Sequence, residues 1–151
     1  MPSLTLRDAQ VGDCAALSAL AFASKASWGY DAAFMEACRA ALTILPENLR
    51  NARIRIADEK TMVGFHGVMG EELEWLFVAP AAQGRGVGAA LLADACEVAA
   101  TAGVRELFIE ADPFAAAFYE HRGARLVGER PSSAIAGRVL PLYSLDLALV
   151  S

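Results

Sequence analysis

A glycine-rich turn near the middle of the chain has the composition of an anion-binding loop. The segment Gln83-Gly84-Arg85-Gly86-Val87-Gly88 follows an apolar run that ends in Ala79-Pro80, and an alanine- and leucine-rich stretch follows the turn directly. Glycine lets the backbone approach an anion closely, while the free N–H groups and the dipole of a following helix add partial positive charge. The sequence therefore predicts a site for a phosphorylated ligand at this turn.

Two other phosphate-binding patterns resemble this turn in part. A P-loop needs a Lys and a Ser or Thr after its last glycine, and nothing near Gly84 supplies them. The dinucleotide fingerprint G-x-G-x-x-A fits Gly84, Gly86 and Ala89, and the acidic Glu110 follows about twenty residues later. Against it, residues 79–83 separate the apolar run from the first glycine, and too little chain remains for a doubly wound sheet.

The pattern Gln83-x-x-Gly86-x-Gly88, between a Phe-Val-x-Pro strand end and a long apolar helix, resembles the GNAT superfamily of N-acetyltransferases. The resemblance implies that backbone N–H groups of the turn bind the pyrophosphate of acetyl-CoA. It also implies a bulge in the preceding strand that splays this strand from the next one. The cofactor-binding residues that it implies are Phe77, Val78, Gln83, Gly84, Arg85, Gly86, Val87, Gly88, Ala89, Asp112 and Ala115.

A second segment strengthens the resemblance. The β-rich run 104–110 leads to Asp112 and Pro113, a good helix N-cap and first helical residue, and the helix ends at Gly123. This resembles the second GNAT signature, which implies that Tyr119 is the general acid. A half-buried structural tyrosine is the alternative. Many relatives have Asn where this chain has Phe114, so we expect weaker or differently placed cofactor contact there.

Acetyl transfer to an amine needs a base, an acid and an oxyanion donor. An amine with a pKa of about 10 must lose a proton before it attacks, and a leaving thiolate with a thiol pKa near about 8.5 must gain one. Tyr119 is the predicted acid. We expect the oxyanion donor to be a backbone N–H group around Phe77 or Val78, beside the thioester.

Several residues are candidates for the base. We favour Glu74, which precedes the glycine turn by a few residues and could act through a water molecule. Glu72 shares its strand face if no bulge intervenes, and solvated strand residues are the alternative interpretation of both. Glu110 is less attractive because it fits a local cap or ion pair. His66 has a suitable pKa, but a single strand histidine is more often simply hydrogen-bonded.

Two polar loops are candidates for binding the acceptor. Trp28 and Tyr30 lie in a loop that interrupts the helical pattern, where aromatic rings can stack on a ligand. Arg130, Ser132 and Arg138 lie in a loop between the last two strands, where they could hold a carboxylate or hydroxyl groups. If they do, the acceptor carries a negative group as well as an amine, as an amino acid does. A helix joint and a decorated hairpin are the alternatives.

Composition excludes several classes of protein. The 151 residues suit a single domain, 1–151, and no apolar run reaches the length of a membrane span although 56% of residues are hydrophobic. Three scattered cysteines and two histidines predict neither disulfides nor a metal site. A net charge of −5 disfavours nucleic-acid binding. With no signal-peptide pattern, we expect a cytoplasmic protein that does not bind membranes.

The order of predicted elements matches the GNAT order across the chain. Periodicity predicts strands at 4–7, 53–57, 62–69, 73–78, 104–110, 125–129 and 139–147, and helices at 13–24, 31–42, 86–102 and from 112. The fold class is mixed α/β: a mostly antiparallel sheet of about seven strands flanked by about four helices. We predict an N-acetyltransferase that uses acetyl-CoA on a small-molecule amine by direct attack in a ternary complex. Open alternatives are a non-catalytic acyl-CoA-binding module and a protein or peptide amine acceptor, and analogy suggests a homodimer.

Overall fold

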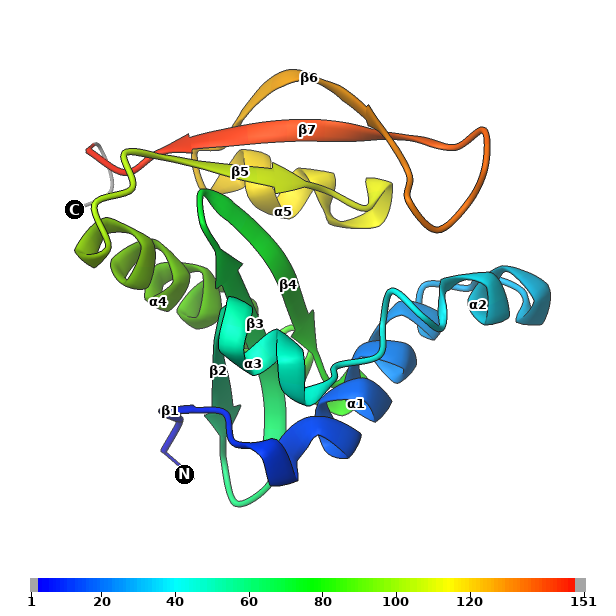
Figure 1. The fold of residues 1–151 in the computed structure, drawn as a ribbon, viewed down its shortest axis with the longest axis horizontal. Helices are drawn as coiled ribbons and strands as arrows, with labels where there is room; N and C mark the ends of the chain where they lie inside the picture. Colours follow the sequence, from blue (N-terminus) through cyan, green and yellow to red (C-terminus); the bar gives the residue numbers. More distant parts are fainter. Residues whose placement is uncertain (1–2, 149–151) are drawn as a thin grey trace.

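The computed structural model describes residues 3–148, and a single mixed sheet organises them (Figure 1). Its seven strands lie in the order β1-β2-β3-β4-β5-β7-β6, with the β4–β5 pair parallel and every other pair antiparallel. This confirms the predicted fold class. The strands are β1 (Thr5–Asp8), β2 (Arg53–Asp58), β3 (Met62–Met69), β4 (Glu72–Val78), β5 (Glu106–Glu110), β6 (Arg125–Pro131) and β7 (Val139–Asp146).

Five α-helices accompany the sheet in the described residues: α1 (Cys14–Ala26), α2 (Ala32–Cys38), α3 (Pro46–Asn51), α4 (Val87–Thr101) and α5 (Ala116–His121). Three differ from the sequence expectation. The helix expected from Asp112 begins with a 3-10 turn at Pro113–Ala115, and α5 follows it. The helix predicted at 31–42 ends at Cys38, and the following residues bury Leu42 and Ile44 through turns instead. No helix was expected at α3, which begins at Pro46, because a proline that closes one element also suits the first turn of the next helix.

The sheet has a separate apolar core on each face. One core joins α1 and α2 to Ile54, Ile56 and Phe65 of the central strands. On the opposite face α4 packs against β3 and β4, and side chains of β5, β7 and Tyr119 of α5 continue that core. Alternation along β3 divides its side chains between the two faces, since Phe65 joins the α1 core while the neighbouring His66 bonds to Asp94 of α4.

The fold feature that matters most for function is the divergence of β4 from β5. Gly67 pairs with Trp75 and Val68 pairs with Leu73, so Glu74 is the extra residue of a bulge in β4. The parallel pairing of β4 with β5 is confined to Glu72 and Phe108. Figure 1 shows β4 turning away from β5 beyond this point. This confirms the predicted bulge and splay, and it opens a gap beside the C-terminal half of β4.

No helix among residues 3–148 is long and apolar enough to cross a bilayer.

Candidate active site

A cavity of about 460 Å³ lies where the glycine turn, β4, α1 and the α5 region meet. We call it the cofactor-side cavity. Most of the predicted cofactor-binding residues line it: Val78, Gln83, Gly84, Gly86, Val87, Gly88, Ala89 and Ala115. The structure thus brings the sequence motif together with the start of the second signature, which lies about thirty residues further along the chain.

The backbone of the glycine turn is shaped for close approach. Gly84 and Gly86 have φ angles of 78° and 83°, in the left-handed region that residues other than glycine rarely adopt. Helix α4 begins immediately after Gly86, so its first N–H groups have no intrahelical acceptors and are free to bind an anion.

Three predicted cofactor residues do not line this cavity. Arg85 forms an ion pair with Glu59. Phe77 lies on the opposite face of β4, in a second cavity. Asp112 accepts hydrogen bonds from the Phe114 amide and the Tyr30 hydroxyl, and it forms an ion pair with Lys25. The side chains of these residues are therefore committed elsewhere.

The backbone of β4 offers polar groups to the gap. The Ala79 amide donates to the Val63 carbonyl, which sets the phase of the antiparallel ladder with β3. By the same alternation Phe77 bonds to β3, whereas the amides of Leu76 and Val78 point away from it, toward the gap. Of the two positions predicted for the oxyanion donor, Val78 therefore has the suitable direction. Leu76 is the second such position, and the register that reveals it depends on the bulge.

Tyr119 lies on the wall of the cofactor-side cavity. Its side chain is only 6% exposed, and among the described residues its hydroxyl has no hydrogen-bond partner. Burial raises the pKa of Tyr119 above its ordinary value, so the phenol is protonated at neutral pH. A protonated hydroxyl on the cavity wall suits the predicted role of general acid.

A second cavity of about 570 Å³ lies on the other face of β4, and we call it the acceptor-side cavity. It gathers the favoured base, two alternative bases and most of the predicted acceptor residues. The residues of this kind in its lining are Glu72, Glu74, Glu110, Arg130, Ser132 and Arg138. Tyr30 lies close by, since its hydroxyl accepts a hydrogen bond from Arg138 at 2.7 Å.

Glu74, the predicted base, lies on the wall of the acceptor-side cavity. Because Glu74 is the bulged residue, it and Trp75 both line the acceptor-side cavity, while Leu73 is buried in the opposite core. Burial raises the pKa of Glu74, and the negative charges of Glu72 and Glu110 raise it further. A carboxylate with a raised pKa is a stronger base than an ordinary glutamate.

Asp112 fastens the two predicted acceptor loops together. Lys25 Nζ lies 3.1 Å and Arg138 Nη2 lies 3.5 Å from Asp112 Oδ2, and the Tyr30 hydroxyl donates to the same carboxylate at 2.9 Å. Burial and Asp112 raise the pKa of Tyr30 to about 12. The structure brings the two loops together, with Asp112 as their anchor, a role that sequence reasoning missed.

The predicted acceptor residue Trp28 lines the cofactor-side cavity instead. Its ring stacks on Phe114 with centroids 6.1 Å apart, and Tyr30 meets the same ring edge-on at 5.5 Å. Phe114 remains 61% exposed. The residue that departs from the family signature is therefore part of an aromatic cluster at the cavity wall.

His66 is separate from both cavities. It is fully buried, and its Nε2 lies 2.7 Å from Asp94 Oδ2, which also accepts a hydrogen bond from Arg55 at 3.0 Å. Burial lowers the pKa of His66, and this effect outweighs the attraction of Asp94. The hydrogen-bonded interpretation of this histidine is confirmed.

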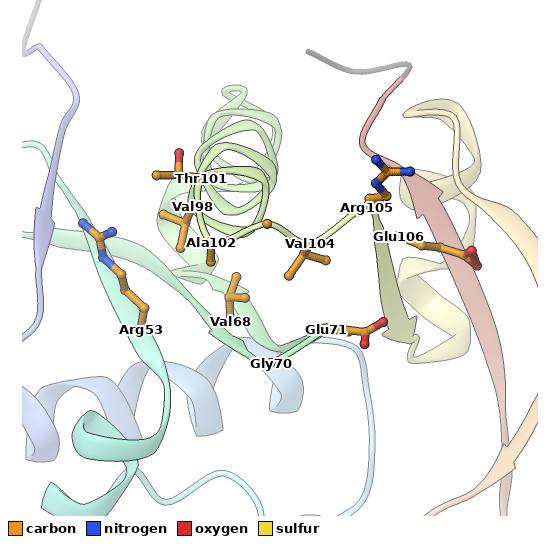
Figure 2. Close-up of a pocket in the computed structure, with 11 residues that line it drawn as sticks. Arg53, Val68, Gly70, Glu71, Val98, Thr101, Ala102, Val104, Arg105 and Glu106 are labelled. Atoms are coloured by element: carbon orange, nitrogen blue, oxygen red, sulfur yellow. The ribbon is translucent and has the colours of Figure 1, made fainter.

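A third hollow of about 690 Å³ lies at the far end of α4 from the glycine turn (Figure 2). Val68, Val98 and Val104 surround it, with Arg53 and Arg105 at its two sides. No predicted catalytic or cofactor residue lines it, so its size does not make it the active site. In the part of the chain from 3 to 148, no group of three or more His, Cys, Asp or Glu side chains is placed to hold a metal ion.

Comparisons with known proteins agree with this geometry. Residues 50–123 match the family model described as an acetyltransferase (GNAT) domain. No curated protein matches significantly. A GCN5-related N-acetyltransferase structure from Rhodopseudomonas palustris is 24% identical, with 97% of each chain covered and a TM-score of 0.86.

Two further structures share the fold and contain a cofactor. The PaiA N-acetyltransferase from Thermoplasma acidophilum, in complex with coenzyme A, is 16% identical over 95% of this chain and 99% of that chain, with a TM-score of 0.78. The putative acetyltransferase YncA from Salmonella typhimurium, with acetyl-CoA, is 20% identical over 96% and 94%, with a TM-score of 0.67. Residues 50–123 thus match the GNAT acetyltransferase family, and the described part of the chain has the GNAT fold.

Proposed function

We propose that this protein transfers an acetyl group from acetyl-CoA to a primary amine of a small molecule, by direct attack in a ternary complex. The observation that carries the proposal is the pair of cavities on opposite faces of β4, at the point where this strand leaves β5. One cavity has the glycine turn, and the other has Glu74. The cofactor complexes of similar folds support acetyl-CoA as the donor.

Acetyl-CoA would supply the activated acetyl group, and the residues of this chain would bind it and move the protons. The N–H groups at the start of α4 bind the pyrophosphate, while the amides of Leu76 and Val78 stabilise negative charge on the thioester oxygen. Glu74 accepts the proton of the attacking ammonium group, directly or through water. Tyr119 donates a proton to the departing thiolate, so the products are an amide and a neutral thiol.

A second candidate is a module that binds acyl-CoA without catalysis. Phe114 favours it, because a phenyl ring at this position cannot make the side-chain hydrogen bond of an asparagine. A protein or peptide amine is a further candidate acceptor for the catalytic function. The volume of the acceptor-side cavity, about 570 Å³, suits a small molecule, since a peptide needs an extended groove.

The first test is calorimetric titration with acetyl-CoA, CoA and NAD, followed by measurement of CoA release with a panel of amines. The proposal expects micromolar binding of acetyl-CoA, none of NAD, and amine-dependent release of CoA. Binding without release in the presence of any amine would favour the non-catalytic module. Binding of NAD in place of acetyl-CoA would restore the dinucleotide interpretation of the glycine turn.

A further inference from the structure

The charged residues of the acceptor-side cavity are unevenly paired. Three carboxylates, Glu72, Glu74 and Glu110, line the cavity around the bulge of β4, and Arg130 contacts the first and the last of them. The Arg130 guanidinium lies 2.8 Å from Glu72 and 3.7 Å from Glu110. Within residues 3–148, no hydrogen bond or ion pair reaches the side chain of Glu74.

The other two cations on the cavity wall share a single carboxylate. Lys25 and Arg138 both pair with Asp112, and Arg138 also donates to the Tyr30 hydroxyl. Counting Asp112, the region holds four carboxylates and three cations, so an acceptor carboxylate would enter a region of net negative charge. This costs free energy, because like charges repel. The structure therefore argues against the sequence expectation of a negatively charged group on the acceptor.

The geometry points to a short alkyl diamine as the acceptor, an inference that rests on the proposed function. We propose that one amino group reacts beside Glu74, while the second stays protonated and is held by Glu110 and Glu72. These two carboxylates carry one more negative charge than Arg130 balances. Glu72 and Glu74 are two positions apart across the bulge of β4, at most about 6.6 Å along the strand, which suits a short spacer. Trp75, Phe77 and Leu140 supply apolar surface along the cavity for its methylenes.

Electrostatics at the carboxylates are consistent with this occupant. The pKa of Glu74 is raised by burial and by its two negative neighbours, and the pKa of Glu110 is also raised by burial. A bound ammonium ion would favour the charged form of each carboxylate and so remove this repulsion. A monoamine has no second ammonium group, so it could not compensate the charges of Glu72 and Glu110 once its nitrogen lies beside Glu74.

Three acceptors of nearly equal length test the inference: putrescine, n-butylamine and 4-aminobutyrate. All three carry a primary amine on a chain of three methylenes, and the group at the far end of that chain is an aminomethyl, a methyl or a carboxylate. With saturating acetyl-CoA, we expect kcat/KM for putrescine to exceed that for n-butylamine by about tenfold, with 4-aminobutyrate the poorest of the three. Equal values for putrescine and n-butylamine, or a preference for 4-aminobutyrate, would overturn the inference.

Variants of the carboxylates sharpen the test. Glu110→Gln should lower the ratio of putrescine to n-butylamine about fivefold. In the double variant Glu72→Gln with Glu110→Gln, Arg130 loses both partners, so the preference should reverse toward 4-aminobutyrate. Glu129→Gln, at an exposed position of β6 outside the cavity, is the matched control and should leave the ratios unchanged. A double variant that keeps the original order would contradict the assignment of the two carboxylates.

The outcomes separate this inference from the function on which it rests. If acetyl-CoA does not bind, or no amine at all releases CoA, then the proposed function fails and the inference fails with it. If acetyl-CoA binds and an amino acid or an arylamine is acetylated while putrescine is not, only the inference fails.

Discussion

Tyr119→Phe removes one hydroxyl and leaves the ring contacts of a buried residue intact. Because this hydroxyl has no hydrogen-bond partner among residues 3–148, its loss should change the free energy of unfolding by less than about 1 kcal/mol. For the same reason, the dissociation constant of acetyl-CoA should stay within about threefold of its original value. The variant therefore separates a chemical role from a packing role.

The expected loss of rate follows from the acidity of the two groups. An ordinary tyrosine has a pKa about 1.5 units above that of a thiol, so protonating the thiolate is uphill by about 2 kcal/mol. Burial raises the pKa of Tyr119 further, which places its contribution at the low end of general acid catalysis. We expect kcat to fall about 100-fold, equivalent to about 2.7 kcal/mol of transition-state stabilisation.

The assay is CoA release, followed with a thiol reagent, alongside calorimetric binding of acetyl-CoA. Tyr143→Phe is the control, because Tyr143 is also buried but donates its hydroxyl to Glu120 and lines neither cavity. This control should lose about 1 kcal/mol of stability while keeping kcat. A kcat for Tyr119→Phe within threefold of the original would refute the acid assignment. A loss confined to acetyl-CoA affinity would instead mean that the hydroxyl serves binding.

Three further predictions concern the base, the turn and the buried histidine. Glu74→Gln should lower kcat/KM about 100-fold. In the original protein kcat/KM should decline at low pH, starting above the usual pKa range of a glutamate, because the pKa of Glu74 is raised. A pH–rate profile should show that the variant lacks this decline. Gly86→Ala should weaken acetyl-CoA binding about tenfold in a titration, because alanine at φ 83° costs about 1–2 kcal/mol, whereas Gly70→Ala, at φ 60° in the β3–β4 turn, should leave affinity unchanged. The pKa of His66 is lowered in the folded protein, so below about pH 6.5 the unfolded chain binds a proton more readily than the folded one. The free energy of unfolding should therefore fall as the pH drops through that range. Urea unfolding of His66→Gln should show no such fall with pH.

Local patterns predicted most of the fold. The predicted strand at 62–69 and the predicted helix after Gly86 match the structure. Both rest on signals within a short segment: alternation of side chains in the strand, and a glycine just before the first turn of the helix. The errors arose where one local signal has two meanings. Pro46 can end one element or begin another, and the apolar residues up to Leu42 are buried equally well by turns as by a continued helix.

The candidate site divides in the same way. The lining of the cofactor-side cavity follows largely from one continuous motif, whereas the role of Asp112 depends on Lys25, which lies 87 positions away in the sequence. Nothing in the local sequence shows that the cations of two distant loops converge on this carboxylate. The catalytic roles of Tyr119 and Glu74 remain predictions, and the structure supplies positions that are compatible with both.

The divergence of β4 from β5 also affects where the sheet opens by local unfolding. Strands β1 to β4 and strands β5 to β7 form two blocks, whose backbone ladder is continuous only at Glu72 and Phe108, with the Phe108 amide donating to the Glu71 carbonyl. A pantetheine arm lying in the gap would extend this junction like a short extra strand. A ligand at about 100 times its dissociation constant adds about 2.7 kcal/mol to the free energy of unfolding. Here the ligand would stabilise the β4–β5 junction, where the sheet has its fewest backbone hydrogen bonds. The unliganded protein should therefore open along this junction first, and amide hydrogen exchange in β5 should slow more than exchange in β2 when the cofactor binds.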